Sequence, residues 1–190
     1  GLLVEQTGEA PKSCVQHALS LPIIRGAGVQ TDDPFFRATS AVCNIPTLTS
    51  AAQASGFLNA APDPDGILRR APLLMQYGGR VYPALSLAAV RSVANSHNLV
   101  LRIANVNTAA LGLEGQEVPL DGKSNLLLRY RGEKRSFPYV SAVDVLNGQV
   151  HPDEFKDRIV FVGTTALGTR EVVATPLDTL FVGVEVQATV

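Results

Sequence analysis

The sequence has few charged residues, no charge excess of either sign and no long apolar run. Only 17% of its 190 residues are charged, below the roughly 25% usual in soluble proteins, so we expect another subunit or domain to cover part of its surface. The net charge is −1, and the 6% aromatic residues are not interleaved with basic clusters, which argues against a nucleic-acid partner. No stretch approaches the roughly 18 apolar residues that would span a bilayer.

Cysteines and catalytic motifs are also scarce. Cys14 and Cys43 allow one disulfide at most and lack metal-ligand spacing. They fit an oxidising compartment, but they fit two small buried thiols equally well. The three histidines lie in unrelated contexts, and there is no Gly-x-Ser-x-Gly elbow. We therefore predict no catalytic residue, no metal site and no cofactor.

With 46% hydrophobic residues, the chain has enough apolar material for the core of one domain, residues 1–190. Its patterns predict an α/β (α+β) fold, with a mixed β-sheet flanked by helices. Strands are expected at residues 56–60, 99–103, 118–120 and 125–131, with the apolar run 158–162 as the central strand. Helices are expected at residues 48–54, ended by Gly56, from Tyr82-Pro83 to about Asn95, at 141–148, and as one turn at 152–156.

A strong turn is predicted at Asp63-Pro64-Asp65-Gly66, because Asp can bond its own backbone, Pro fixes φ and Gly accepts a positive φ. It should connect two antiparallel strands. The aspartates lack the further oxygen ligands of a calcium loop. Arg69 and Arg70 follow at once, so one can pair with a carboxylate while the other faces solvent or a ligand.

The loop Gly163-Thr164-Thr165-Ala166-Leu167-Gly168 follows the expected central strand. Ligands of α/β proteins bind outside the carboxyl ends of strands, and such a loop can offer backbone N–H groups to an anion. The loop matches neither the dinucleotide-binding nor the P-loop pattern. The alternative to a ligand-binding loop is a structural one, in which the glycines allow a tight turn where the chain leaves the sheet.

A series of motifs in fixed order resembles the second class of CHASE domains, over about residues 56–188. These motifs are the G-x-x-N-x-x-x-D-x-D-G-x-x-R-R block from Gly56 to Arg70, Tyr82-Pro83-Ala84-Leu85, Leu128-Arg129-Tyr130-Arg131-Gly132, Phe137-Pro138-Tyr139, Asp144-Val145-Leu146-Asn147-Gly148, Arg158-Ile159-Val160-Phe161-Val162-Gly163, Thr175-Pro176 and Gly183-Val184-Glu185-Val186. Three positions depart from the family pattern. Arg170 stands at or beside an acidic position, and Val182 and Gln187 stand for a Pro and a His.

The resemblance implies a sensory module outside the cytoplasmic membrane, periplasmic in a bacterium, and not an enzyme. In that family, transmembrane helices flank the module. The output is an adenylate or guanylate cyclase, a diguanylate cyclase, a histidine kinase of a two-component system, or a serine/threonine kinase. We accordingly expect a piece of a longer receptor, working as a homodimer and responding to a small molecule or an environmental change.

The expected ligand site joins Arg69, Arg70, Gly163, Thr164, Thr165 and Thr175, with Asp63, Asp65 and Gly66 as a structural turn. Two alternatives stay open. One is a soluble α/β enzyme that uses the Gly163 loop, which needs converging titratable groups with perturbed pKa values. The other is an interaction module without a small-molecule ligand, which needs a large apolar face.

Overall fold

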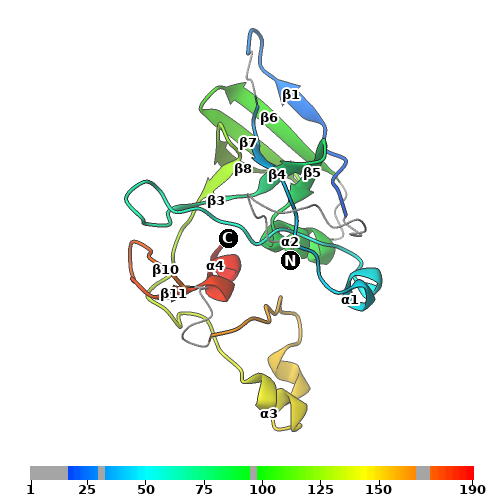
Figure 1. Ribbon diagram of the computed structural model, residues 1–190, viewed down its shortest axis with the longest axis vertical. Coiled ribbons are helices and arrows are strands. Elements are labelled where there is room, and N and C mark those ends of the chain that lie inside the picture. The colour runs from blue at the N-terminus through cyan, green and yellow to red at the C-terminus, as the bar shows by residue number, and fades with distance from the viewer. Residues whose placement is uncertain (1–16, 30–32, 95–97, 166–171) are drawn as a thin grey trace.

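The computed structural model describes residues 17–29, 33–94, 98–165 and 172–190, which form an α+β fold (Figure 1). Its largest sheet has four strands, in the spatial order β1 (Ile23–Arg25), β6 (Leu99–Asn105), β7 (Thr108–Leu113) and β8 (Gln116–Asp121). β1 is parallel to β6, whereas β6, β7 and β8 form an antiparallel meander. The turn between β7 and β8 has a positive φ at both Glu114 and Gly115, as the two-residue hairpin turns that match strand twist require.

Three smaller sheets complete the strands. The three-stranded sheet has the order β2 (Phe36–Ala38), β4 (Leu74–Tyr77) and β5 (Arg80–Pro83). The two-stranded sheets pair β3 (Arg70–Pro72) with β9 (Asn125–Leu127), and β10 (Val172–Val173) with β11 (Phe181–Val182). The mixed-sheet prediction is confirmed, although the pairing is divided among several short sheets.

The helices are short. They are α1 (Pro46–Ala51), α2 (Leu85–Ala94), α3 (Ala142–Leu146), the 3-10 turn η1 (Pro152–Glu154) and α4 (Gly183–Thr189). The predictions of a helix within 141–148 and of a helical turn within 152–156 are confirmed, and Gly148 takes the left-handed conformation after α3. Ser141 stands at the N-cap position of α3, but its side chain makes no capping hydrogen bond.

The apolar side chains form two buried clusters. The main cluster lies between the strands and α2 and includes Leu74, Leu101 and Leu111, all fully buried. A second, smaller cluster joins β3, β9 and β11 to α4, with members Leu68, Ala71, Leu128, Phe181 and Val186. α4 is thereby packed into the body of the domain by its apolar face.

Four local predictions are wrong. Residues 56–60 form no strand; only Phe57 makes an isolated bridge to Ala84. Gly56 does not cap α1 in a left-handed conformation, since α1 ends at an extended Ala52. Instead Gly56 approaches Leu85 so closely that a Cβ would lie 2.6 Å from its Cα.

The other two wrong predictions concern the strands beside the Asp63–Gly66 turn and the residue at which α2 begins. The Asp63–Gly66 turn forms, but no antiparallel strand pair flanks it: Ile67 makes a parallel bridge to Ala174. Tyr82-Pro83 belongs to β5 and does not begin α2. α2 begins two residues later, after Ala84 has donated to the Leu73 carbonyl (2.8 Å), because pairing with β4 outweighs the preference of Pro for the first helical turn.

The largest correction concerns the expected central strand. Residues 158–162 pair with no strand and belong to a long excursion, residues 129–165, which we call the arm. No residue of the arm is buried. In Figure 1 the arm carries α3 to the end of the molecule opposite the four-stranded sheet and returns beside α4. A β-branched run favours extended structure, but it specifies no pairing partner.

Candidate functional site

The residues predicted to bind a ligand surround the unit formed by β10, β11 and α4. Leu68 donates to the Ala174 carbonyl (2.8 Å), which brings the segment of Arg69 and Arg70 beside Thr175. Gly163 lies against α4, because a Cβ placed on it would fall 2.7 Å from the Cβ of Val184. The structure thus brings the three predicted segments to one unit, although each meets a different part of it.

Arg69 closes the predicted turn. Its guanidinium pairs with Asp63 (3.2 Å) and with Asp65 (2.8 Å), and Gly66, at φ +82°, donates to the Asp63 carbonyl (2.8 Å). The bond from Arg69, helped by the Ile67 amide, lowers the pKa of Asp65. The same carboxylates raise the pKa of Arg69. The guanidinium of Arg69 is therefore engaged in ion pairs, which is the alternative that the sequence analysis left open for it.

Arg70 differs from its neighbour. It is the exposed first residue of β3. Within the described part of the chain it takes part in none of the ion pairs. Of the two predicted arginines, Arg70 is thus the one that is available to an anionic group.

Gly163, Thr164 and Thr165 lie at the exposed end of the arm, outside any helix or strand. Because residues 158–162 are not a strand, the loop does not sit at the carboxyl end of a sheet, and the argument from strand ends does not apply to it. The remainder of the predicted loop, from Ala166 to Gly168, lies outside the described residues.

Thr175 is 4% exposed and stabilises its own turn. Its hydroxyl donates to the Asp178 carbonyl (3.0 Å) and accepts from the Asp178 amide (3.0 Å). The turn borders an open depression of about 400 Å³, lined by Glu133, Thr175, Pro176, Leu177, Asp178 and Thr179. The Leu180 amide, followed by that of Lys134, lowers the pKa of Asp178. With two carboxylates in its lining, the depression suits a cationic or neutral polar group better than an anion.

The sequence analysis missed a buried carboxylate. Glu185, on α4, is 2% exposed, and three groups of the arm donate to it: the amides of Arg135 and Ser136 and the hydroxyl of Tyr139, each at 2.9 Å. A buried charge needs such donors. The signal in the sequence was a glutamate inside the apolar run Gly183-Val184-Glu185-Val186.

Tyr139 shares in this arrangement. Its burial, followed by the bond to Glu185, raises the pKa of Tyr139 to about 12. The hydroxyl therefore stays protonated and donates to the carboxylate throughout the physiological range. Together with the two amides it fastens the base of the arm to α4.

The family comparison decides what kind of domain carries these features. A family model described as the CHASE2 domain matches residues 7–190, nearly the whole chain. The chain belongs to the CHASE2 family. CHASE2 domains are extracellular sensory domains of membrane receptors. No curated protein and no solved structure matched the chain.

As a CHASE2 domain, the chain is a sensory module and is itself not an enzyme. The groups with a shifted pKa in the described residues fit this role. Asp65, Arg69, Asp178 and Tyr139 owe their shifts wholly or partly to structural hydrogen bonds, and Tyr130 owes its shift to burial. They do not converge on the Gly163 loop, as the enzyme alternative required.

One further feature of this CHASE2 domain bears on its environment. Cys43 is disulfide-bonded and packs against the main core; Cys14, the other cysteine of the sequence, lies outside the described residues. Disulfides persist mainly in oxidising compartments, which agrees with an extracellular domain. None of the helices in the described ranges is long and apolar enough to cross a bilayer.

Gln187 replaces the histidine expected in the closing motif and is buried. Its amide nitrogen donates to the Leu58 carbonyl (3.3 Å). Its Oε1 has no hydrogen-bond partner within the part of the chain that the structure describes. Gln187 thus links α4 to the segment that follows α1, and any histidine chemistry of relatives does not carry over to it.

Proposed function

We propose that this CHASE2 domain is the signal-sensing part of a bacterial transmembrane receptor, located in the periplasm, and that α4 passes the signal on. The signal is a small molecule or an environmental change. The output domain is of the cyclase, histidine kinase or serine/threonine kinase type, and the receptor works as a homodimer. The proposal rests on the family, on the disulfide at Cys43 and on the contacts of α4.

The contacts of α4 are the observation that carries the proposal. Its residue Glu185 holds the base of the arm, Val184 touches Gly163 at the end of the arm, and Gln187 reaches the Leu58 carbonyl. α4 also lies against α2, and its residue Val186 belongs to the second buried cluster. A displacement of any of these segments would therefore move α4.

The proposed signal site is the depression at residues 175–179, with Arg70 on the neighbouring β3. A ligand that binds one arrangement of this loop better than another biases the two arrangements by that difference in affinity. The loop leads through β11 directly into α4. Binding at the depression would thus shift the position of α4.

Amide chemical shifts of the labelled domain would test the site, recorded while small cationic and zwitterionic metabolites are added. We expect saturable shifts at residues 175–179 and in α4, and weaker binding after Asp178→Asn. Lys123→Ala, on the turn after β8, serves as the control variant. Shifts confined to the four-stranded sheet would contradict the site.

The sequence of the parent reading frame would test the receptor role. We expect apolar spans of about 20 residues on its flanks and a cyclase or kinase domain beyond them. A soluble domain joined directly after residue 190 would contradict the role.

The ligand-free interaction module remains a second candidate, and the arm favours it. Large apolar side chains are exposed along the arm, namely Tyr139, Val140, Val143, Val145, Leu146, Ile159, Val160 and Val162. Contiguous apolar surface of this kind marks protein interfaces. The two roles are compatible, because a sensor can signal through such an interface.

A further inference from the structure

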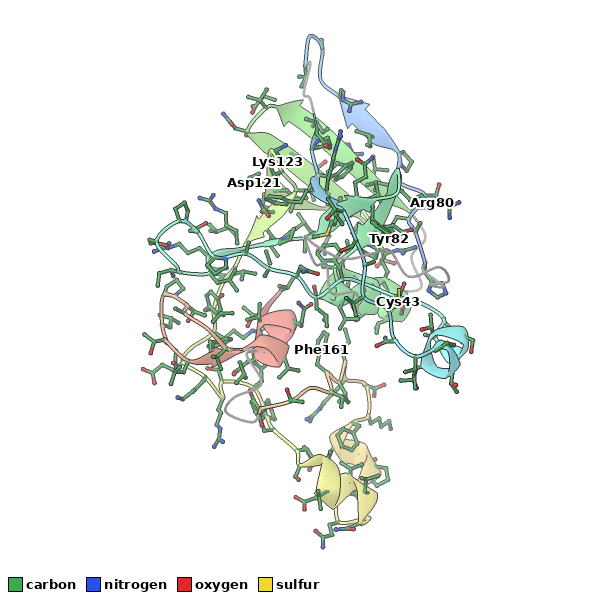
Figure 2. The ribbon with its side chains drawn as sticks, viewed as in Figure 1. Cys43, Arg80, Tyr82, Asp121, Lys123 and Phe161 are labelled. Carbon is green, nitrogen blue, oxygen red and sulfur yellow. The ribbon has the colours of Figure 1, made fainter. Side chains whose placement is uncertain are left out.

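We propose that two copies of this domain exchange strands, residues 158–162 of each copy pairing with the free edge of β9 in the other. The donor is the run Arg-Ile-Val-Phe-Val, which has the composition of a central strand but pairs with no strand here. Val162 is 88% exposed, and Ile159 and Val160 are also exposed. In Figure 2, Phe161 lies between the arm and the body of the domain, and it is half-buried.

The acceptor is the outer edge of β9. Its sheet has only two strands, β3 and β9, so one edge of β9 has no strand beside it within the described residues. The chain there is already extended: Leu126 packs on the main core and Leu128 lies in the second cluster, while Leu127 between them is 68% exposed. An open strand edge next to exposed apolar side chains is a template for pairing.

Chain order ties donor to acceptor. β9 is followed by α3 and then by residues 158–162, which is the strand, helix, strand order that joins neighbouring parallel strands. In this structure the unit is open. Figure 1 shows the returning orange segment below α4, whereas β8, which leads into β9, lies above α4.

The arm is held open at both ends. Glu185 binds residues 135–139 at its base, and Gly163 is seated on Val184 at its end. Residues 158–162 immediately precede Gly163, and with this contact in place they pair with no strand of their own copy among the described residues. In the proposed exchange, their acceptor belongs to another molecule.

A second copy of the chain fits the donor best. Each copy carries one donor and one acceptor, so two copies related by a two-fold axis satisfy both and leave no edge open. A stable dimer buries about 800 Å² per partner, and an arm without a buried residue can supply such a surface. The arm carries charges of both signs in near balance, so two arms do not repel one another.

The proposed function and the strand exchange both involve a homodimer, but the strand exchange does not depend on the sensing role. A chain that exchanges strands but binds nothing at residues 175–179 keeps the inference and loses the sensor site. A chain that binds a ligand there as a monomer does the reverse.

The first test uses Val160→Asp, with Val106→Asp as the matched control. Both valines are exposed, and Val106 lies in the turn between β6 and β7. Mass by light scattering and sedimentation should show a dimer for the unchanged chain and for the control. Val160→Asp should give a monomer with an unchanged circular dichroism spectrum. A monomeric unchanged chain, or a Val160→Asp variant that dimerises as tightly as the control, would overturn the proposal.

The second test locates the contact with single cysteines, Leu127→Cys in one chain and Val160→Cys in another, unfolded and refolded together with the native disulfide intact. We expect a covalent heterodimer on a non-reducing gel, and little covalent dimer from either variant alone. A chain carrying both substitutions that links internally and stays a monomer would overturn the exchange. So would efficient linkage of Leu127→Cys to itself, because β9 would then face β9.

Discussion

The body of the domain and its arm both contain many apolar residues but are stabilised in different ways. In the body, a buried cluster that contains Leu74, Leu101 and Leu111 holds the sheets and α2 together. In the arm, residues 129–165, no side chain is buried. The arm is fastened by hydrogen bonds to Glu185, by the seat of Gly163 on Val184 and, at its start, by Tyr130, which packs against Phe181 and donates to the Leu68 carbonyl. An apolar run in the sequence thus does not decide whether the segment joins the core of its own chain.

The largest expected difference between the two regions is in the cost of removing an apolar side chain. Leu74→Ala, at a fully buried site, should lower the free energy of unfolding by about 3 kcal/mol. Val162→Ala in the arm should change it by about 0.5 kcal/mol or less. Urea unfolding at low protein concentration measures both. If the loss of unfolding free energy caused by Val162→Ala, but not that caused by Leu74→Ala, rises with protein concentration, strand exchange gains support. Equal losses for both variants would contradict the difference between arm and body.

The next effect concerns the fastening of the arm. Glu185→Ala removes the acceptor of three hydrogen bonds and should destabilise the base of the arm by about 2–4 kcal/mol. Limited proteolysis should then cut within residues 129–165 while the four-stranded sheet stays protected. Tyr139→Phe removes one of the three bonds and serves as the milder matched variant. Cleavage that begins in the sheet would show that Glu185 supports the body instead.

A smaller effect is expected at high pH. The pKa of Tyr139 and that of Tyr130 are both raised to about 12, above the ordinary value of about 10. A raised pKa favours the folded state below pH about 10, and this contribution is lost as the pH rises from about 10 to 12. Ultraviolet titration should show one fewer late-titrating tyrosine in Tyr139→Phe than in the unchanged chain. If Tyr139→Phe leaves the late step unchanged, Tyr139 is not the hydroxyl donor to Glu185 described above.

The smallest effect is expected at the Asp63–Gly66 turn, because its ion pairs are exposed. The pKa of Asp65 is lowered, chiefly by Arg69. Its contribution to stability is therefore present above pH about 4 and is lost as the pH falls through the lowered value. Asp65→Asn should remove this acid dependence and alter stability at neutral pH only slightly, as thermal unfolding at several pH values would show. A large loss at neutral pH would mean that the turn supports the second cluster.

Local patterns predicted the elements that local forces determine. β6 follows from the alternation of residues 99–103, and the end of α3 follows from the glycine at position 148. β7 was missed, because Ala109, Ala110 and Gly112 are weak strand formers. It forms because β6 and β8 pair with both of its edges. For residues 158–162 the error was the opposite one: a strand was predicted and none forms. Strong strand propensity alone does not supply a strand to pair with.

The candidate site was predictable only in part. The motif order gave the family, and the family model extends the match to residues 7–190. Arg69 was singled out, but only the structure shows that Asp63 and Asp65 occupy it. Glu185 was missed because its three donors lie almost fifty residues earlier in the chain. Such a pairing depends on how the arm folds back and leaves no local trace.

The contact between Gly163 and Val184 leaves no room for a side chain at position 163. A methyl group on Gly163 would lie 2.7 Å from a branched side chain that cannot rotate out of its way. Either the end of the arm or the first turn of α4 must then move. With the proposed role of α4, Gly163→Ala in a full-length receptor would push on this helix without any stimulus, and a genetic selection for receptors that signal permanently should recover it.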